Sequence, residues 1–134
     1  MERGPIPLKM HAMLEPFMAI LIIASPWIFG FSDVDSATTL AVVVGLVMLV
    51  GGAITRWRWS LAKVLPLRMH MMTDLALGAL LILSPFIFGF SDEGGATRWA
   101  IIVGVLELMT ALGTRWDPAE ADDPRAGTRH TAAA

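Results

Sequence analysis

The chain has 134 residues and a formal net charge of −2, and 55% of its residues are hydrophobic whereas only 16% are charged. This composition is too apolar for an ordinary soluble domain of this length. The chain contains no cysteine, which excludes disulfide bonds and thiolate metal sites.

Four long apolar runs follow one another along the chain. They cover residues 16–32, 36–55, 75–91 and 99–114; three of them contain no Asp, Glu, Lys or Arg, and the fourth contains only Glu107. A helix needs about 20 mostly apolar residues to cross the hydrocarbon core of a bilayer. We therefore predict an all-α fold, an integral membrane four-helix bundle, with transmembrane helices at about 13–31, 37–55, 71–90 and 97–115.

One unit is copied in tandem along the chain. Residues 7–57 align without a gap on residues 66–116, at an offset of 59 positions, and 24 of the 51 aligned pairs are identical. Repetition at a fixed period indicates duplicated structural units, so we expect two hairpins related by a pseudo-two-fold axis. The predicted organisation is an N-terminal segment (1–11), a first repeat (12–57), a basic connection (58–68), a second repeat (69–116) and a disordered polar tail (117–134).

The distribution of charge predicts how the helices are oriented. Nine of the ten basic residues lie near the termini or the connection between the repeats, whereas the two hairpin loops hold four acidic residues and only Arg98. Short cytoplasmic loops are enriched in Lys and Arg, so we expect both termini to be cytoplasmic. Because the basic residues follow this topology, we expect the lipid bilayer as a partner and no nucleic acid.

A nine-residue motif occurs once in each unit. It reads SPWIFGFSD at 25–33 and SPFIFGFSD at 84–92. Each proline frees a carbonyl of the preceding turn, and the serine before it can donate a hydrogen bond back to that turn. The glycine four residues later is expected to let another backbone approach. We interpret the motif as structural, and its residues are Ser25, Pro26, Trp27, Gly30, Ser84, Pro85, Phe86 and Gly89.

Small residues recur at every fourth position in the second helix of each unit. This spacing lets transmembrane helices pack closely. We expect these faces to tighten each hairpin and to support assembly with a second copy or with a larger membrane complex. The residues are Ala37, Ala41, Gly45, Ala96, Ala100 and Gly104.

Two pairs of polar residues are the candidates for chemistry. His11 precedes Glu15 by four positions, and His70 precedes Asp74 by four. On a helix each pair would share a face, and the repeat symmetry would bring both pairs towards the central axis. Two imidazoles and two carboxylates suit zinc, iron or manganese, and two histidines suit a haem. The structural alternative is a set of half-solvated interfacial side chains. Pro16 favours a helix start at that residue, which would leave His11 outside the helix.

Glu107 is the other polar outlier. It lies near the middle of the last apolar run, where the first unit has Met48. A charged side chain at that depth costs about 2.5–3.5 kcal/mol on insertion scales. We expect it either to support packing or partner binding, or to serve a proton or ion pathway.

The sequence resembles the SPW repeat family of bacterial integral membrane proteins. The resemblance rests on Ser25-Pro26-Trp27 followed by Gly30-Phe31, on the tandem copy, and on an acidic residue ten positions before each Ser-Pro. It covers residues 10–57 and 69–116, and the second unit departs from it at Phe86. The resemblance implies a small multi-pass protein of the bacterial inner membrane, and it implies no particular activity.

These observations lead to one leading hypothesis and two alternatives. The leading hypothesis is a non-enzymatic inner (plasma) membrane protein, without a cofactor, that acts as a structural or accessory module. The alternatives are a small proton-linked carrier that uses Glu107, and a metal- or haem-binding protein that uses His11 and His70. No sequence motif of a soluble enzyme supports catalysis.

Overall fold

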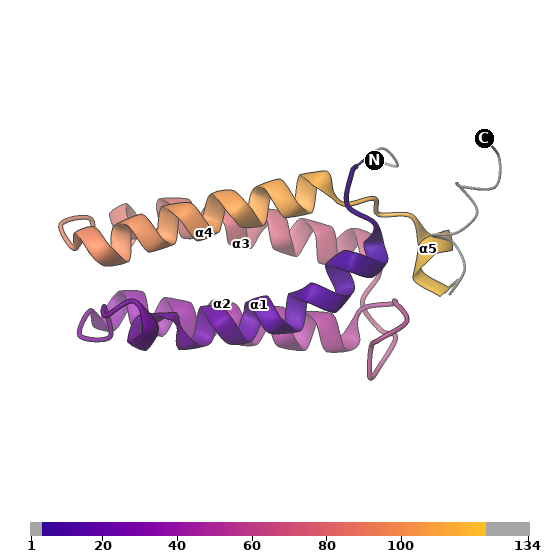
Figure 1. Cartoon of the computed structure of the whole chain (residues 1–134), viewed down its shortest axis with the longest axis horizontal. Helices are drawn as coiled ribbons and strands as arrows, with labels where there is room; N and C mark the ends of the chain where they lie inside the picture. The colour runs from indigo at the N-terminus through magenta and orange to yellow at the C-terminus, as the bar shows by residue number, and fades with distance from the viewer. Residues whose placement is uncertain (1–3, 123–134) are drawn as a thin grey trace.

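The computed structural model describes residues 4–122, which form four long helices and one short helix. The helices are α1 (Leu8–Ile28), α2 (Asp35–Ile54), α3 (Leu67–Ile87), α4 (Gly94–Gly113) and α5 (Pro118–Asp122). Figure 1 shows the long helices side by side in an elongated bundle, with α5 and the connection between α2 and α3 at the same end. The predicted all-α four-helix bundle is confirmed.

The bundle consists of two hairpins. The most extensive helix contacts are those of α1 with α2 and of α3 with α4, whereas α2 and α3 form a smaller contact between the hairpins. Apolar side chains from both hairpins share one core, in which the rings of Phe31 and Trp99 lie 5.0 Å apart between centroids. The four long helices have 20 or 21 residues each and are apolar enough to cross a membrane.

Each helix begins and ends earlier than we expected, and the difference matters most for α1. This helix begins at Leu8, directly after Pro7, and α3 begins directly after Pro66. Both prolines have extended backbones and precede the first helical turn. Pro16 lies inside α1, so the prediction that the helix starts there, leaving His11 outside, is wrong. The helix continues because Pro16 removes only one backbone donor.

The Ser-Pro pairs satisfy the carbonyls that the prolines free. Ser25 Oγ donates a hydrogen bond to the Ile22 carbonyl at 2.6 Å, and Ser84 Oγ donates to the Leu81 carbonyl at 2.7 Å. Each accepting carbonyl lies four residues before a proline, where a helical N–H would otherwise donate. A buried carbonyl without a donor is costly in a membrane, so the serine lets the helix pass through the proline.

The glycines of the same motif have a different role from the one we expected. Gly30 and Gly89 have φ values of +73° and +71°, and no atom would lie within 4 Å of a Cβ added at either position. The expected close approach of another backbone is therefore wrong. Glycine is favoured there because left-handed backbone ends each helix, as in a Schellman motif. The amide of Phe31 then donates to the Pro26 carbonyl at 2.8 Å.

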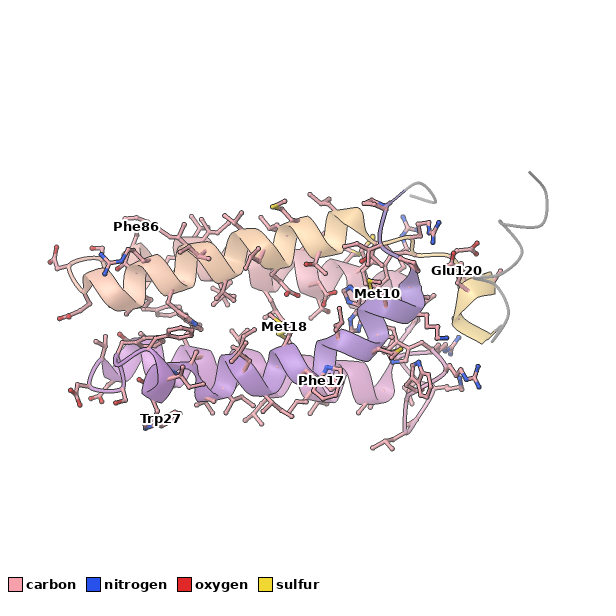
Figure 2. The ribbon with its side chains drawn as sticks, in the orientation of Figure 1. Met10, Phe17, Met18, Trp27, Phe86 and Glu120 are labelled. Carbon is pink, nitrogen blue, oxygen red and sulfur yellow. The ribbon has the colours of Figure 1, made fainter. Side chains whose placement is uncertain are left out.

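The aromatic residue of the motif faces away from the bundle. Trp27 is 61% exposed and Phe86 is 68% exposed, and Figure 2 shows both on the outside of their helices. The replacement of tryptophan by phenylalanine therefore changes a surface of the bundle that faces its surroundings, and it leaves the core unchanged.

The small-residue faces lie inside the hairpins. A Cβ added at Gly45 would lie 2.7 Å from the Ala19 carbonyl oxygen, and one added at Gly104 would lie 2.7 Å from the Gly78 carbonyl oxygen. The alanines of both faces are buried as well: Ala37, Ala41, Ala96 and Ala100. These faces hold α2 against α1 and α4 against α3, so they are not free for a partner.

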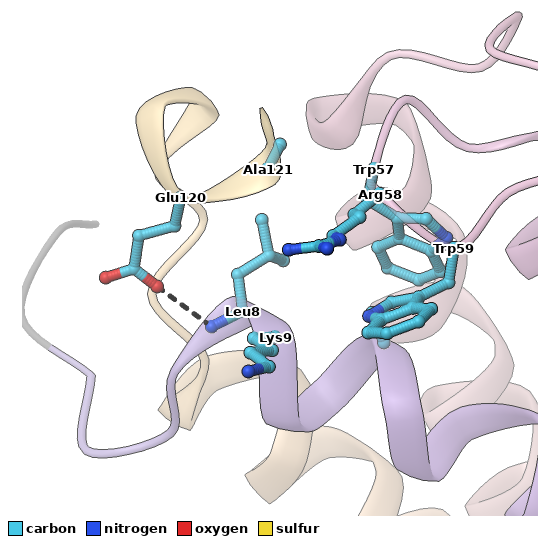
Figure 3. A pocket seen from close by; sticks show the side chains of 8 residues that line it. Leu8, Lys9, Trp57, Arg58, Trp59, Glu120 and Ala121 are labelled. Atoms are coloured by element: carbon cyan, nitrogen blue, oxygen red, sulfur yellow. Dashed lines mark hydrogen bonds between the residues drawn. The ribbon is translucent and has the colours of Figure 1, made fainter. Parts of the chain in front are cut away.

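A short helix closes one end of the bundle. Glu120 of α5 accepts a hydrogen bond from the backbone amide of Leu8 at 3.1 Å, as Figure 3 shows, and it lies 3.5 Å from Arg115. The prediction of a disordered tail is wrong for residues 118–122, because this contact orders them at the start of α1. Residues 123–134 of the predicted tail, and residues 1–3 of the N-terminal segment, lie outside the described residues.

Candidate metal centre

Four polar side chains meet inside the bundle, at the end where α1 and α3 begin. His11 and Glu15 come from α1, and His70 and Asp74 come from α3. Their relative exposures are only 5%, 5%, 2% and 3%, in that order. The repeat symmetry thus brings both pairs together, and the expectation of half-solvated side chains is wrong. The helices start early enough to bury all four residues.

One ligand atom each from His11, Glu15 and His70 lie within 4.8 Å of one another, and Asp74 lies close to both imidazoles. His11 Nε2 lies 3.4 Å from Glu15 Oε2 and 3.3 Å from Asp74 Oδ2. His70 Nε2 lies 3.0 Å from Glu15 Oε2 and 3.4 Å from Asp74 Oδ2. Ligands placed about 2.0–2.1 Å from a tetrahedral zinc ion are about 3.3 Å apart. None of these ligand atoms has a hydrogen-bond partner among the described residues, although all are buried.

Two threonine hydroxyls fix the orientation of the imidazoles. Thr55 Oγ1 donates to the Gly51 carbonyl at 2.5 Å, and Thr114 Oγ1 donates to the Thr110 carbonyl at 2.7 Å. Since each hydroxyl has a single hydrogen, it can only accept from the histidine beside it. His70 Nδ1–H therefore donates to Thr55 at 2.7 Å.

His11 has the same environment in the other repeat. Its Nδ1–H donates to Thr114 Oγ1 at 3.0 Å. With Nδ1 protonated, the neutral imidazole presents the lone pair of Nε2 to the carboxylates. Histidines that bind metals usually donate their other ring N–H to such a fixed acceptor. At 3.0–3.4 Å from the carboxylate oxygens, each Nε2 can either share a metal ion with them or carry a proton that pairs with them.

Two tryptophans cover the imidazoles. The Trp57 ring lies 4.5 Å from the His70 ring, and the Trp116 ring lies 4.9 Å from the His11 ring, between centroids. Their indole N–H groups donate to the carbonyls of Gly52 and Ala111 at the ends of α2 and α4. The tryptophans thus exclude water from the centre and restrict the rotation of both rings.

The threonine and tryptophan that contact each histidine come from the other repeat. Thr55 and Trp57 follow α2 in the first unit but contact His70 of the second, and Thr114 and Trp116 contact His11 in the reverse sense. Sequence analysis did not assign these four residues to the site. The identical Thr-Arg-Trp at 55–57 and 114–116 was the available signal, since matched polar residues at helix ends marked two equivalent positions.

Haem does not fit this arrangement. In a bis-histidine haem site the plane between the two Nε2 atoms must be clear for the macrocycle. Here the carboxylate oxygens of Glu15 and Asp74 each lie 3.0–3.4 Å from both Nε2 atoms and occupy that plane. The donor set of two nitrogens and two oxygens instead suits a small borderline divalent ion.

The remaining sequence candidates lie outside the centre. Glu107 is half-buried and shares a cavity of about 260 Å³ with His11 and Glu15, and it is close enough to interact electrostatically with all four residues of the centre. It is not within the set of mutually close ligand atoms, which are those of His11, Glu15 and His70. The Ser-Pro motifs lie towards the opposite ends of α1 and α3.

Four apolar helices of membrane-spanning length around a buried polar centre define a multi-pass helical membrane protein. The sequence matches the SPW repeat domain over residues 9–114, and the chain belongs to this family. The match confirms the resemblance seen in the sequence and includes every residue of the centre except Trp57's counterpart, Trp116. No curated protein and no solved structure matched the chain.

Proposed function

We propose that this protein binds one divalent transition-metal ion inside the membrane, and that zinc fits the centre best. The observation that carries the proposal is that each of the two Nε2 atoms lies 3.0–3.4 Å from one oxygen of Glu15 and one oxygen of Asp74. A divalent cation balances the charges of Glu15 and Asp74 while both imidazoles stay neutral. The buried centre then carries no net charge, which is what a low-dielectric interior requires.

The ion has a structural role in this proposal. With Asp74 as the fourth ligand beside His11, Glu15 and His70, the shell of a tetrahedral ion would be full, whereas catalytic zinc sites keep a position open for water or substrate. Each hairpin supplies one histidine and one carboxylate, and the most extensive helix contacts lie within the hairpins. An ion at this position would link the two hairpins, between which the helix contacts are less extensive than within each hairpin. The proposal is therefore that of a non-enzymatic protein.

We also infer that the protein lies in the inner (plasma) membrane of a bacterium, with both termini cytoplasmic. The excess of basic residues near the termini and in the 58–66 connection supports this orientation. The start of α1, the connection between α2 and α3, and α5 lie at the same end of the bundle in Figure 1. The metal centre would then lie near the cytoplasmic face of the membrane.

Two other functions have less support. Assembly with a second copy or a larger complex remains a prediction, but the small-residue faces expected to mediate it are used within the hairpins. A proton-linked carrier using Glu107 is not favoured by the helices, because α1 to α4 run without the midplane interruption that many carriers use.

Equilibrium metal binding tests the proposal. Protein in lipid nanodiscs, first treated with a chelator, is titrated with Zn²⁺ in a calorimeter. We expect one ion per chain in the wild type and an affinity lower by more than about 100-fold in His11→Ala and His70→Ala, since loss of a ligand exceeds the effect of losing an outer contact.

The third histidine provides a matched control. His130 lies outside the described residues, and His130→Ala should bind zinc as the wild type does. Wild-type affinity in His70→Ala, or no saturable binding in the wild type, would refute the metal centre.

A further inference from the structure

A lateral cavity lies between the two hairpins, beside the metal centre. It has a volume of about 260 Å³, and α1 and α4 supply most of its walls. A second cavity of about 450 Å³ continues from it between the same helices, and the two share Met18, Ile22, Val103 and Leu106. Figure 2 shows Met18 of α1 in the space between α1 and α4. The two cavities form one apolar groove.

The groove opens towards the lipid. Met10, Met18 and Leu106 line it and are 51%, 39% and 50% exposed. At the end near the chain termini it is closed by Ile6, whose amide donates to the Gly113 carbonyl at 2.9 Å and whose carbonyl accepts from Arg115. A molecule dissolved in the bilayer can therefore reach the groove from the side, whereas a hydrated ion meets an apolar wall.

Carboxylates form the polar end of this groove. Glu107 and Glu15 both line the smaller cavity, and no Lys or Arg does; Arg98 lines the larger one, towards the start of α4. Glu15 is 5% exposed, and its Oε1 atom has no hydrogen-bond partner among the described residues. Glu107 forms no hydrogen bond or ion pair within residues 4–122. Both carboxylates are available to a ligand in the smaller cavity.

The charges leave Glu107 without a counterion. Glu15 and Asp74 face His11 and His70, which can balance them with or without a metal ion. No equivalent partner faces Glu107 among the described residues, and Met48 occupies its place in the first repeat. An uncompensated carboxylate inside the membrane costs about 2.5–3.5 kcal/mol on insertion scales. Glu107 therefore either holds a proton or pairs with a cation. A positive charge in the cavity would stabilise its ionised form.

We propose that the groove between α1 and α4 binds a hydrophobic organic monocation from the bilayer, with its charge at Glu107. The class comprises lipophilic ammonium and phosphonium ions. The cation lies in the smaller cavity, and its apolar groups fill the adjoining one. Because Glu107 is not one of the proposed metal ligands, the two proposals can fail separately.

Binding of tetraphenylphosphonium to the full chain in nanodiscs tests this inference. The radiolabelled ion is titrated against protein-containing and empty nanodiscs. Two variants probe the site: Glu107→Gln removes the charge, and Val103→Phe fills the junction of the two cavities. Two controls match them: Glu93→Gln changes a carboxylate outside the groove, and Val105→Phe adds the same bulk to a residue of α4 that does not line either cavity.

We expect saturable binding of one ion per chain in the wild type and in both controls. Glu107→Gln and Val103→Phe should each weaken binding by about tenfold or more, the effect of losing roughly 1.4 kcal/mol of interaction. Binding no greater than in empty nanodiscs would overturn the inference. So would wild-type affinity in Glu107→Gln. Because the two variants perturb charge and volume separately, misfolding of one leaves the other as a test.

Discussion

Thr55 of the first repeat accepts a hydrogen bond from His70 of the second repeat, with its hydroxyl oxygen 2.7 Å from His70 Nδ1. Thr114 holds His11 in the same way, at 3.0 Å. Each repeat supplies two ligands, but the residues that orient a histidine come from the opposite repeat. One repeat alone therefore cannot form either half of the centre, and the site needs two units just as the bundle does.

Replacing Thr55 should weaken metal binding without removing a ligand. In Thr55→Val the Nδ1–H of His70 loses its acceptor, and the ring is no longer fixed with Nε2 towards the ion. Changes of this kind usually reduce metal affinity by about 10- to 100-fold, which calorimetry can measure. Thr73→Val is the control, because Thr73 also donates to a carbonyl four residues back, but its hydrogen bond is exposed and lies outside the centre. Equal affinities in the two variants would contradict the role of Thr55.

Removing the metal should destabilise the fold. A ligand at about 100 times its dissociation constant stabilises the folded state by about 2.7 kcal/mol. A chelator should accordingly lower the melting temperature of the wild-type protein and leave that of a His11→Ala/His70→Ala double variant unchanged. Melting can be followed by circular dichroism in detergent. A wild-type melting temperature indifferent to chelator and to added zinc would argue against a structural ion.

Ser25→Ala should destabilise α1. The change leaves the Ile22 carbonyl, four residues before Pro26, without the donor that Ser25 supplies at 2.6 Å. A buried polar group left unsatisfied costs about 1–3 kcal/mol, and chemical unfolding in detergent can measure the loss. Ser36→Ala, at an exposed position of α2, should have little effect. If both variants were equally stable, the serine would not be needed at the proline.

Gly45→Ala should loosen the first hairpin. The added Cβ would lie 2.7 Å from the Ala19 carbonyl oxygen and would overlap the side chain of Ile23. Overpacking of this kind typically costs about 1–3 kcal/mol. Gly95→Ala is the matched control, because no atom would lie within 4 Å of its Cβ, and alanine favours helix by about 1 kcal/mol. Destabilisation by Gly95→Ala but not by Gly45→Ala would contradict the packing described above.

The orientation can be tested with single cysteines, since the chain contains none. Leu61→Cys introduces a thiol at a position that is 92% exposed in the 58–66 connection. Asp92→Cys introduces one in the loop before α4. A membrane-impermeant maleimide, added to intact cells whose outer membrane is permeabilised, should label the Asp92→Cys variant but not the Leu61→Cys variant. The reverse pattern would invert the proposed topology.

The fold could be predicted because the lengths of the apolar runs and the period of the repeat can be read directly from the sequence. The apolar runs set the four helices, and the 59-residue offset set the two hairpins. Helix starts were less predictable. Pro16 favours a first-turn position by its own geometry, but α1 already begins after Pro7 and tolerates the loss of one bond.

The site was only half predictable. The spacing of His11 with Glu15 and of His70 with Asp74 placed each pair on one helical face, and the repeat suggested that they meet. Their burial depends on how the end of each hairpin packs against the other hairpin. The contacts of Thr55 with His70 and of Thr114 with His11 depend on the same packing. No local pattern encodes that crossing. Gly30 shows the opposite case, since the sequence allowed either close packing or positive φ, and only the backbone distinguishes them.

X-ray absorption at the zinc edge tests the central claim most directly. Protein loaded with one equivalent of Zn²⁺ should show four nitrogen or oxygen ligands at about 2.0–2.1 Å, with outer-shell scattering from two imidazoles. His11→Ala and His70→Ala should each lose the signal of one imidazole. A wild-type spectrum of six oxygen ligands without imidazole scattering, as for hydrated surface zinc, would contradict a metal centre formed by the two repeats.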